Sequence, residues 1–249
     1  MSFSEIAGLA VVIVTAVSMG IFTVVFRRRP YRGLRVLPAF NRLRRAIGLA
    51  VEDGSRLHVS LGRASLIGPQ SASGLVGLSV LDRIAQMSSV SDCPPVATSG
   101  DGAFAILSQD TLHAAYRQAN ALDHYDPTRG MLTGPTPFSY AAGAMPVVMD
   151  ENITANILVG NFGSEIGLVM DAIDRENSFS LAGSDSLPAQ AIFYAAAQDP
   201  LIGEEVFASG AYLQAGPMHA ASLRTQDLLR GLLIVIMIAG AILKLVGML

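Results

Sequence analysis

Residues 153–186, ITANILVGNFGSEIGLVMDAIDRENSFSLAGSDS, contain two apolar segments that are each followed by a turn rich in Gly and Ser. The first segment, 153–159, is predicted to be a buried strand, and its turn leads into a helix over 165–174. Residues 178–182 alternate in polarity, which predicts a second strand, and the turn after it leads into a helix over 187–197. The order strand, turn, helix therefore sets the predicted fold.

The same order recurs about four times along the central part of the chain. Residues 57–61 alternate like a strand, and residues 75–87 have apolar side chains at helical spacing. Further elements are predicted as a short apolar segment over 96–98 and helices over 112–122, 138–149 and 202–213. This alternation predicts an α/β fold with a mostly parallel sheet and helices on its faces, in Rossmann-like layers.

Both ends of the chain are apolar. Residues 6–26 are uncharged, and a bilayer core about 30 Å thick needs about 20 helical residues. Glu5 precedes this segment and arginines follow it, which is the reverse of a signal peptide and favours a retained anchor. The predicted segments are a transmembrane helix over 5–27, a basic juxtamembrane segment over 28–45, a cytoplasmic α/β domain over 46–225 and a transmembrane helix over 228–249.

The arginines predict the orientation. Eight arginines fall between Arg27 and Arg45 with no acid among them, and Arg/Lys residues flank membrane helices on the cytoplasmic side. We therefore expect a two-pass protein of the bacterial inner (plasma) membrane, with the central domain in the cytoplasm and both termini outside. The single cysteine, Cys93, fits a reducing compartment. The predicted membrane-interface residues are Arg27, Arg28, Arg29, Arg32, Arg35 and Arg230.

The basic segment after the first apolar helix is also amphipathic. Phe40, Leu43 and Ile47 recur at helical spacing, with arginines largely on the other side. This pattern predicts a short segment that lies on an anionic headgroup surface, and the alternative is the solvated start of a helix.

Small residues in the two apolar helices suit close packing against other helices. Ala16 and Gly20 are four apart, and Gly240 and Gly247 offer further contact points, although small residues are common in membrane helices generally. Lys244 interrupts the second helix, where it either extends to the outer membrane surface or faces a partner or ion path.

One candidate ligand site follows from the two Gly/Ser turns. A turn between a strand and a helix can present the helix N-terminus to an anion, but Glu165 and Asp185 would repel a phosphate there. If both turns lie at the carboxyl ends of neighbouring strands, the space between them is the usual ligand site of an open α/β sheet. The candidate residues are Gly160, Asn161, Gly163, Ser164 and Ser184.

Other chemistries are poorly supported. The four histidines have no His-x-x-x-His spacing, one cysteine cannot begin a cysteine-based zinc site, and no G-x-S-x-G or P-loop motif occurs. The net charge of −3 argues against nucleic-acid binding. The sequence therefore predicts no catalytic residue, no metal site and no cofactor.

Three groups of residues carry a family resemblance: residues 47–62 (Ile47-Gly48, Glu52-Asp53-Gly54 and His58 to Gly62), Gly160 to Glu165, and Gly183 to Ala191. They resemble a family of uncharacterised bacterial membrane proteins. The resemblance implies the same anchor–domain–anchor layout and a shared fold, and it assigns no activity.

The favoured function is a non-enzymatic scaffold subunit of a homo-oligomer or larger membrane assembly, with the lipid bilayer and other membrane subunits as partners. Only 15% of the residues are charged, against about 25% in typical soluble domains, which fits a domain covered by partners. The alternatives are a membrane-mounted domain that senses a ligand or nucleotide, and a transporter or channel subunit that uses Lys244.

Overall fold

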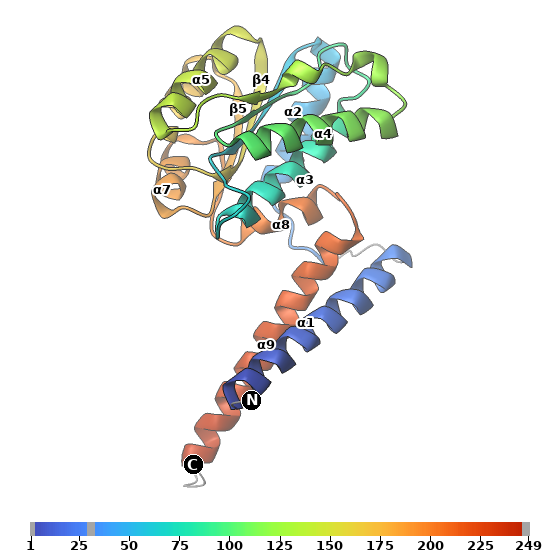
Figure 1. Ribbon diagram of the computed structural model, residues 1–249, viewed down its shortest axis with the longest axis vertical. Coiled ribbons are helices and arrows are strands. Elements are labelled where there is room, and N and C mark those ends of the chain that lie inside the picture. Colours follow the sequence, from blue (N-terminus) through green and yellow to red (C-terminus); the bar gives the residue numbers. More distant parts are fainter. Residues whose placement is uncertain (1–2, 29–32, 246–249) are drawn as a thin grey trace. The chain divides into compact units, whose positions relative to one another are not determined.

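The computed structural model describes residues 3–28 and 33–245 and divides them into two compact units (Figure 1). One unit comprises the terminal segments Met1–Leu34 and Gly216–Leu249, and the other is Arg35–Ala215. The second unit contains the sheet. It begins earlier and ends earlier than the domain predicted over 46–225.

The sheet has six strands, all parallel, in the order β3-β2-β1-β4-β5-β6. This confirms the predicted α/β class with a parallel sheet. The order reverses between β1 and β4, as in the Rossmann fold. The strands are β1 Arg56–Gly62, β2 Val96–Ser99, β3 Gly130–Leu132, β4 Ile153–Asn161, β5 Phe179–Ser184 and β6 Asp199–Leu201.

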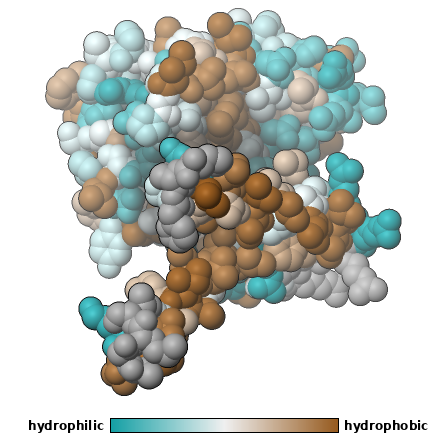
Figure 2. All heavy atoms as spheres, turned by 60° about the horizontal axis from the view of Figure 1, so that its bottom comes forward, coloured by the Kyte–Doolittle hydropathy of each residue, from teal (hydrophilic) through white to brown (hydrophobic). Residues whose placement is uncertain are grey.

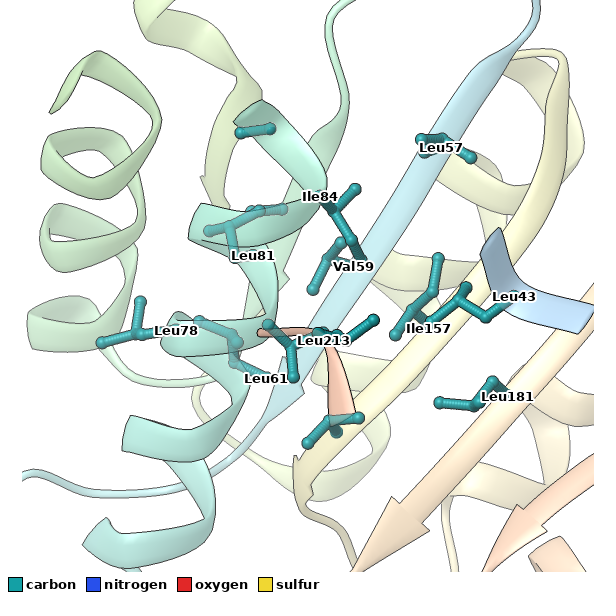
Figure 3. Packing of buried hydrophobic residues seen from close by; sticks show 14 of the residues in the cluster. Leu43, Leu57, Val59, Leu61, Leu78, Leu81, Ile84, Ile157, Leu181 and Leu213 are labelled. Carbon is teal, nitrogen blue, oxygen red and sulfur yellow. The ribbon is translucent and has the colours of Figure 1, made fainter. Parts of the chain in front are cut away.

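Helices pack on both faces of the sheet through two apolar clusters. Side chains of a strand alternate between faces, so Val59 and Ile157 lie in the first cluster and Leu158 in the second. Figure 3 shows the first cluster, in which Leu43 and Ile84 lie over β1 and β4. The first cluster involves α2 Pro38–Asp53, α3 Ser71–Met87, α4 Gly102–Gln118 and α8 Glu205–Tyr212, and the second α5 Pro137–Asp150, α6 Ile166–Arg175 and α7 Leu187–Ala196.

The amphipathic basic segment is helix α2, and its apolar face is part of the domain core. Phe40, Leu43 and Ile47 are 3%, 0% and 2% exposed. These side chains are therefore unavailable for insertion into lipid headgroups, contrary to the interfacial interpretation. A domain boundary at residue 46 would divide this helix in its middle.

The shortest elements differ from the sequence-based expectation. Strands β3 and β6 were not predicted, because three residues are too few for alternation to be seen. Pro200 lies in β6, which is an edge strand. Proline is tolerated there because its missing N–H can face away from the neighbouring strand.

Helix α4 begins at Gly102 and not near Leu112, because the carboxylate of Asp101 accepts hydrogen bonds from the backbone N–H groups of the first turn. The remaining short helices are η1 Leu122–His124 and η2 Pro127–Arg129.

The terminal unit consists of α1 Phe3–Arg28 and α9 Pro217–Leu245, and each helix is long and apolar enough to cross a membrane. Only 6% of the most apolar window of α1 and none of that of α9 is buried, unlike a core helix of a soluble domain. Their surfaces are largely hydrophobic (Figure 2). Helix α9 begins well before residue 228 because Pro217 starts it and no later residue breaks it.

Among the described residues, the predicted packing glycines have open space beside them. A Cβ added to Gly20 or Gly240 would meet no heavy atom within 4 Å, and Ala16 is exposed. Packing against another chain through these positions stays a prediction. Gly247, Arg29 and Arg32 lie outside the described residues.

Candidate functional site

The two predicted turns lie at one edge of the sheet because they follow β4 and β5, which pair in parallel, and β4 also borders the reversal of strand order. Strand β1 leads into α3 on one face, whereas β4 leads into α6 on the other face. In open α/β sheets, ligands bind outside the carboxyl ends of the strands at such a point. Gly160 of β4 and Ser184 of β5 are paired directly in the ladder, so the turns that follow them are neighbours.

Asp185 joins three elements at this edge. Its Oδ1 accepts a hydrogen bond of 2.7 Å from Asn161 Nδ2, and its Oδ2 accepts one of 3.0 Å from Ser73 Oγ. Ser73 is in the first turn of α3 and is fully buried. Each partner donates to a different carboxylate oxygen, so Asp185 is held in one orientation.

Glu165 and Arg63 form the other half of the group. The Glu165 side chain is 4% exposed, and its Oε1 accepts from the backbone N–H of Gly163 at 3.0 Å and lies 3.8 Å from Arg63 Nη1. Arg63 follows β1, and its own backbone N–H donates to the carbonyl of Asn161 at 2.7 Å. These contacts fix the ends of β1 and β4 together. We call Arg63, Ser73, Asn161, Glu165 and Asp185 the switch-point cluster.

One donor in the switch-point cluster is unused. The Nε of Arg63 is buried and has no hydrogen-bond partner among the described residues. A buried N–H without a partner costs free energy, and a ligand that accepts this hydrogen bond would recover it. The cluster thus offers one guanidinium donor beside two carboxylates.

The five predicted ligand residues have different roles in the structure. Gly160 is needed for packing, because a Cβ there would overlap the carbonyl oxygen of Leu61 on β1. Ser184 Oγ accepts from the backbone N–H groups of Phe162 and Ser186, and Gly163 bonds to Glu165, so both stabilise the turns. Asn161 is in the switch-point cluster. Ser164 is exposed in the turn before α6.

A buried polar network lies under α5, on the face of the sheet that also carries the second apolar cluster. His58 Nδ1 is 2.8 Å from Asn156 Oδ1, and its Nε2 is 2.8 Å from Thr98 Oγ1. Thr98 Oγ1 lies 3.1 Å from Ser60 Oγ, and Ser60 is hydrogen-bonded to the Tyr140 hydroxyl of α5. The network joins three central strands to the helix that packs over them.

The network is neutral at pH 7. Burial lowers the pKa of His58 to about 4, and burial raises the pKa of Tyr140 to about 12. Because Asn156 Oδ1 can only accept, the neutral His58 carries its proton on Nδ1.

The sequence did not reveal the switch-point cluster or the network. Arg63 and Ser73 come from a loop and a helix that precede Asn161 by about 90 residues, and no local pattern joins them. The only signal for the network was that His58 and Ser60 are polar at alternate positions of a strand, which places both on one face.

The arrangement suits polar ligands without a phosphate. Glu165 and Asp185 can accept hydrogen bonds from hydroxyl or amino groups, and their charge repels phosphate oxygens. In the part of the chain that the structure describes, no three His, Cys, Asp or Glu side chains are grouped so that they could hold a metal ion.

The sheet order and the cluster at its reversal define a Rossmann-like α/β domain, and the chain joins this domain to two long apolar helices. The chain belongs to the family described as "Domain of unknown function (DUF6754)", which matches residues 1–249. No curated protein and no solved structure matches it. The resemblance to an uncharacterised domain family is thereby confirmed, and a bacterial origin stays a prediction.

Proposed function

We propose that this protein is a membrane-anchored binding module that recognises a small polar ligand at the carboxyl ends of β1, β4 and β5. The supporting observation is that the strand order reverses where Arg63, Asn161 and Asp185 converge. The position of the site rests on analogy with other open α/β sheets. The chemistry of the ligand rests on the side chains of this chain.

Those side chains favour a ligand with hydroxyl or amino donors and one acceptor. Asp185 and Glu165 accept, and the unused Nε of Arg63 donates. The first turn of α3 contains no acidic residue that would repel an anion. The nearby carboxylates of Asp185 and Glu165 do repel one, so a polyphosphate is the less favoured ligand. A small metabolite is therefore preferred over a nucleotide.

In the proposed membrane topology, the chain crosses the bilayer twice. Helices α1 and α9 cross the inner membrane of a bacterium, with the domain in the cytoplasm and both termini outside. Arg27, Arg28 and Arg230 support this orientation through the excess of arginine at cytoplasmic ends. In a Cys93→Ser background, a cysteine replacing Ser4 should react with a membrane-impermeant maleimide added to intact cells. Labelling only after lysis would reverse the topology.

A thermal-shift screen of the detergent-purified full chain tests the binding site. Hydroxylated and amino metabolites should include one that raises the melting temperature. The shift should disappear in Asp185→Asn and persist in Asp110→Asn, a matched change on the exposed side of α4. If no compound shifts the folded protein, or if both variants respond equally, the proposal is wrong.

A second candidate is the scaffold subunit that the sequence favoured. Large apolar side chains are exposed after the carboxyl ends of three strands: Ile67 at 96%, Phe138 at 73% and Leu187 at 78%. Such side chains suit burial against another protein chain. Native mass measurement after extraction in mild detergent should then give an oligomer, and a monomer at all concentrations would exclude it. No separate observation favours the transporter alternative; Lys244 lies in the last turn of α9.

A further inference from the structure

A pocket of about 360 Å³ lies at the opposite end of the sheet, beside the amino ends of β4, β5 and β6. One wall is helix α2, which contributes two arginines and two apolar side chains. The other wall comes from the start of β4, the start of β5 and the residues just before β5 and β6. The lining residues are Arg42, Arg45, Ala46, Leu49, Thr154, Asn177, Phe179 and Gln198. We call this the amino-end pocket.

The two arginines of the amino-end pocket differ in their partners. Arg42 is fixed by Asp199, because its Nε donates to Asp199 Oδ2 at 2.8 Å and its Nη2 also pairs with this carboxylate. The hydrogen bond and charge of Asp199, which is 2% exposed, raise the pKa of Arg42. Arg45 is exposed and makes no hydrogen bond or ion pair with any described residue. Its full charge is therefore available to an anion.

The remaining lining residues suit an anion that carries an apolar part. The amides of Asn177 and Gln198 can donate to phosphate or glycerol oxygens, whereas the hydroxyl of Thr154 donates to Ser55 Oγ. Ala46, Leu49 and Phe179 provide apolar contact beside them. Leu49 is 50% exposed, which leaves its surface open to such a contact.

The amino-end pocket is close in the chain to both connections with the apolar helices. Helix α2 is the first element of the domain, and residues 29–37 alone separate it from α1. Phe40 of α2 stacks on Tyr212, the last residue of α8, with ring centroids 4.8 Å apart, and Arg44 donates to the Tyr212 carbonyl at 2.7 Å. The chain thus enters and leaves the domain at one corner, next to the arginines of α2.

From these observations we propose that the amino-end pocket binds the phosphate group of an anionic phospholipid, with Arg45 as the principal charged contact. A soluble phosphate ester presents the same phosphate group, but it lacks the acyl part that Leu49 and Phe179 would contact. This proposal does not depend on the switch-point cluster.

The test uses the full chain in a neutral detergent, where no charged bilayer surface is present. Short-chain phosphatidylglycerol should raise the melting temperature of the wild type in a saturable manner. Arg45→Gln should weaken the apparent affinity at least tenfold without changing the melting temperature of the free protein. Gln198→Glu, which places a carboxylate in the pocket, should weaken it as well.

Arg35→Gln is the matched control, because Arg35 belongs to the same basic segment but does not line the pocket. Its affinity should fall less than about twofold, since general attraction to an anionic surface, about fivefold per arginine at a bilayer, is small in a neutral micelle. Equal losses in Arg35→Gln and Arg45→Gln, or no saturable shift in the wild type, would overturn the proposal. Equally tight binding of glycerol 3-phosphate or inorganic phosphate would overturn the assignment to a lipid.

Discussion

The two ends of the sheet present opposite chemistry. At the carboxyl ends, Asp185 and Glu165 lie beside a single arginine, and nearly every polar group is already hydrogen-bonded. At the amino ends, Arg45 lines an open pocket and pairs with no acid among the described residues, and the nearby acid, Asp199, pairs with Arg42. The two proposed sites therefore call for chemically unlike ligands.

The difference follows from the direction of the chain. In a parallel sheet, every carboxyl end leads through a turn into a helix N-terminus, where acidic residues stabilise the unpaired N–H groups and the helix dipole. Asp101 and Glu165 occupy such turns. The arginines at the amino ends belong to α2, the first helix after the apolar segment. They lie at the amino ends of β4, β5 and β6 because α2 packs there.

The largest predicted effect is at the carboxyl end. Gly160→Ala should destabilise the protein by about 3 kcal/mol or more, because the new Cβ would overlap the backbone of β1. Thermal unfolding of the detergent-purified chain measures this. Gly167→Ala is the control, because its Cβ would lie 3.9 Å from Ile192 Cδ1, an ordinary contact. Equal stability of the two variants would show that β1 and β4 do not approach closely here.

The centre of the sheet should be sensitive to acid. The pKa of His58 is lowered from 6.5 to about 4 by burial, so the unfolded chain binds a proton between these pH values and the folded chain does not. Stability should therefore fall by about 3 kcal/mol as the pH drops from about 6.5 to 4, in addition to other groups. Denaturation at several pH values should show a smaller slope in His58→Gln. If the slope is the same in wild type and His58→Gln, His58 is not held in its neutral form in the folded chain.

A smaller effect is expected at the amino end. Asp199→Asn should lower the melting temperature by a few degrees, because the buried side chain loses its charged hydrogen bonds while the exposed Arg42 is rehydrated. Asp171→Asn is the matched control, since its pair with Arg175 is exposed on both sides and should be nearly neutral. If the control loses as much stability, the Arg42 pair has no special structural role.

The smallest effect is a gain. Gly48→Ala in α2 should stabilise the protein by up to about 1 kcal/mol, because the position is helical and exposed and its Cβ would meet nothing within 4 Å. The same unfolding measurement applies. A loss of stability would indicate that the backbone of α2 is packed more closely than described.

The fold was predictable where the pattern is local. The segment from Ile153 to Ser186 shows apolar strands and an amphipathic helix within a few residues, and the structure contains β4, α6 and β5 there. Strand order depends on pairings between distant segments, so the reversal between β1 and β4 could not be derived. The apolar face of α2 was visible, but the sequence alone did not show whether lipid or the domain core covers it.

The candidate site was predictable only in part. The turns after Gly160 and Gly183 were expected to meet, and the β4–β5 register places them side by side. Asp185 was considered only as a charge that repels phosphate, because its partner Ser73 is 112 residues away. The amino-end pocket joins α2 to Thr154, Phe179 and other residues more than 100 positions away in the sequence, again without any local signal.

Hydrogen exchange of the full chain in lipid nanodiscs tests the division between the two ends most directly. Nanodiscs of phosphatidylcholine would be compared with nanodiscs that also contain phosphatidylglycerol, each with and without a compound found in the thermal-shift screen. We predict that phosphatidylglycerol protects amides of α2 and residues 177–179, and that the compound protects residues 62–64, 161–165 and 184–186. If phosphatidylglycerol and the compound protect the same segments, or if neither of them protects any of these segments, the proposed division between the two ends is wrong.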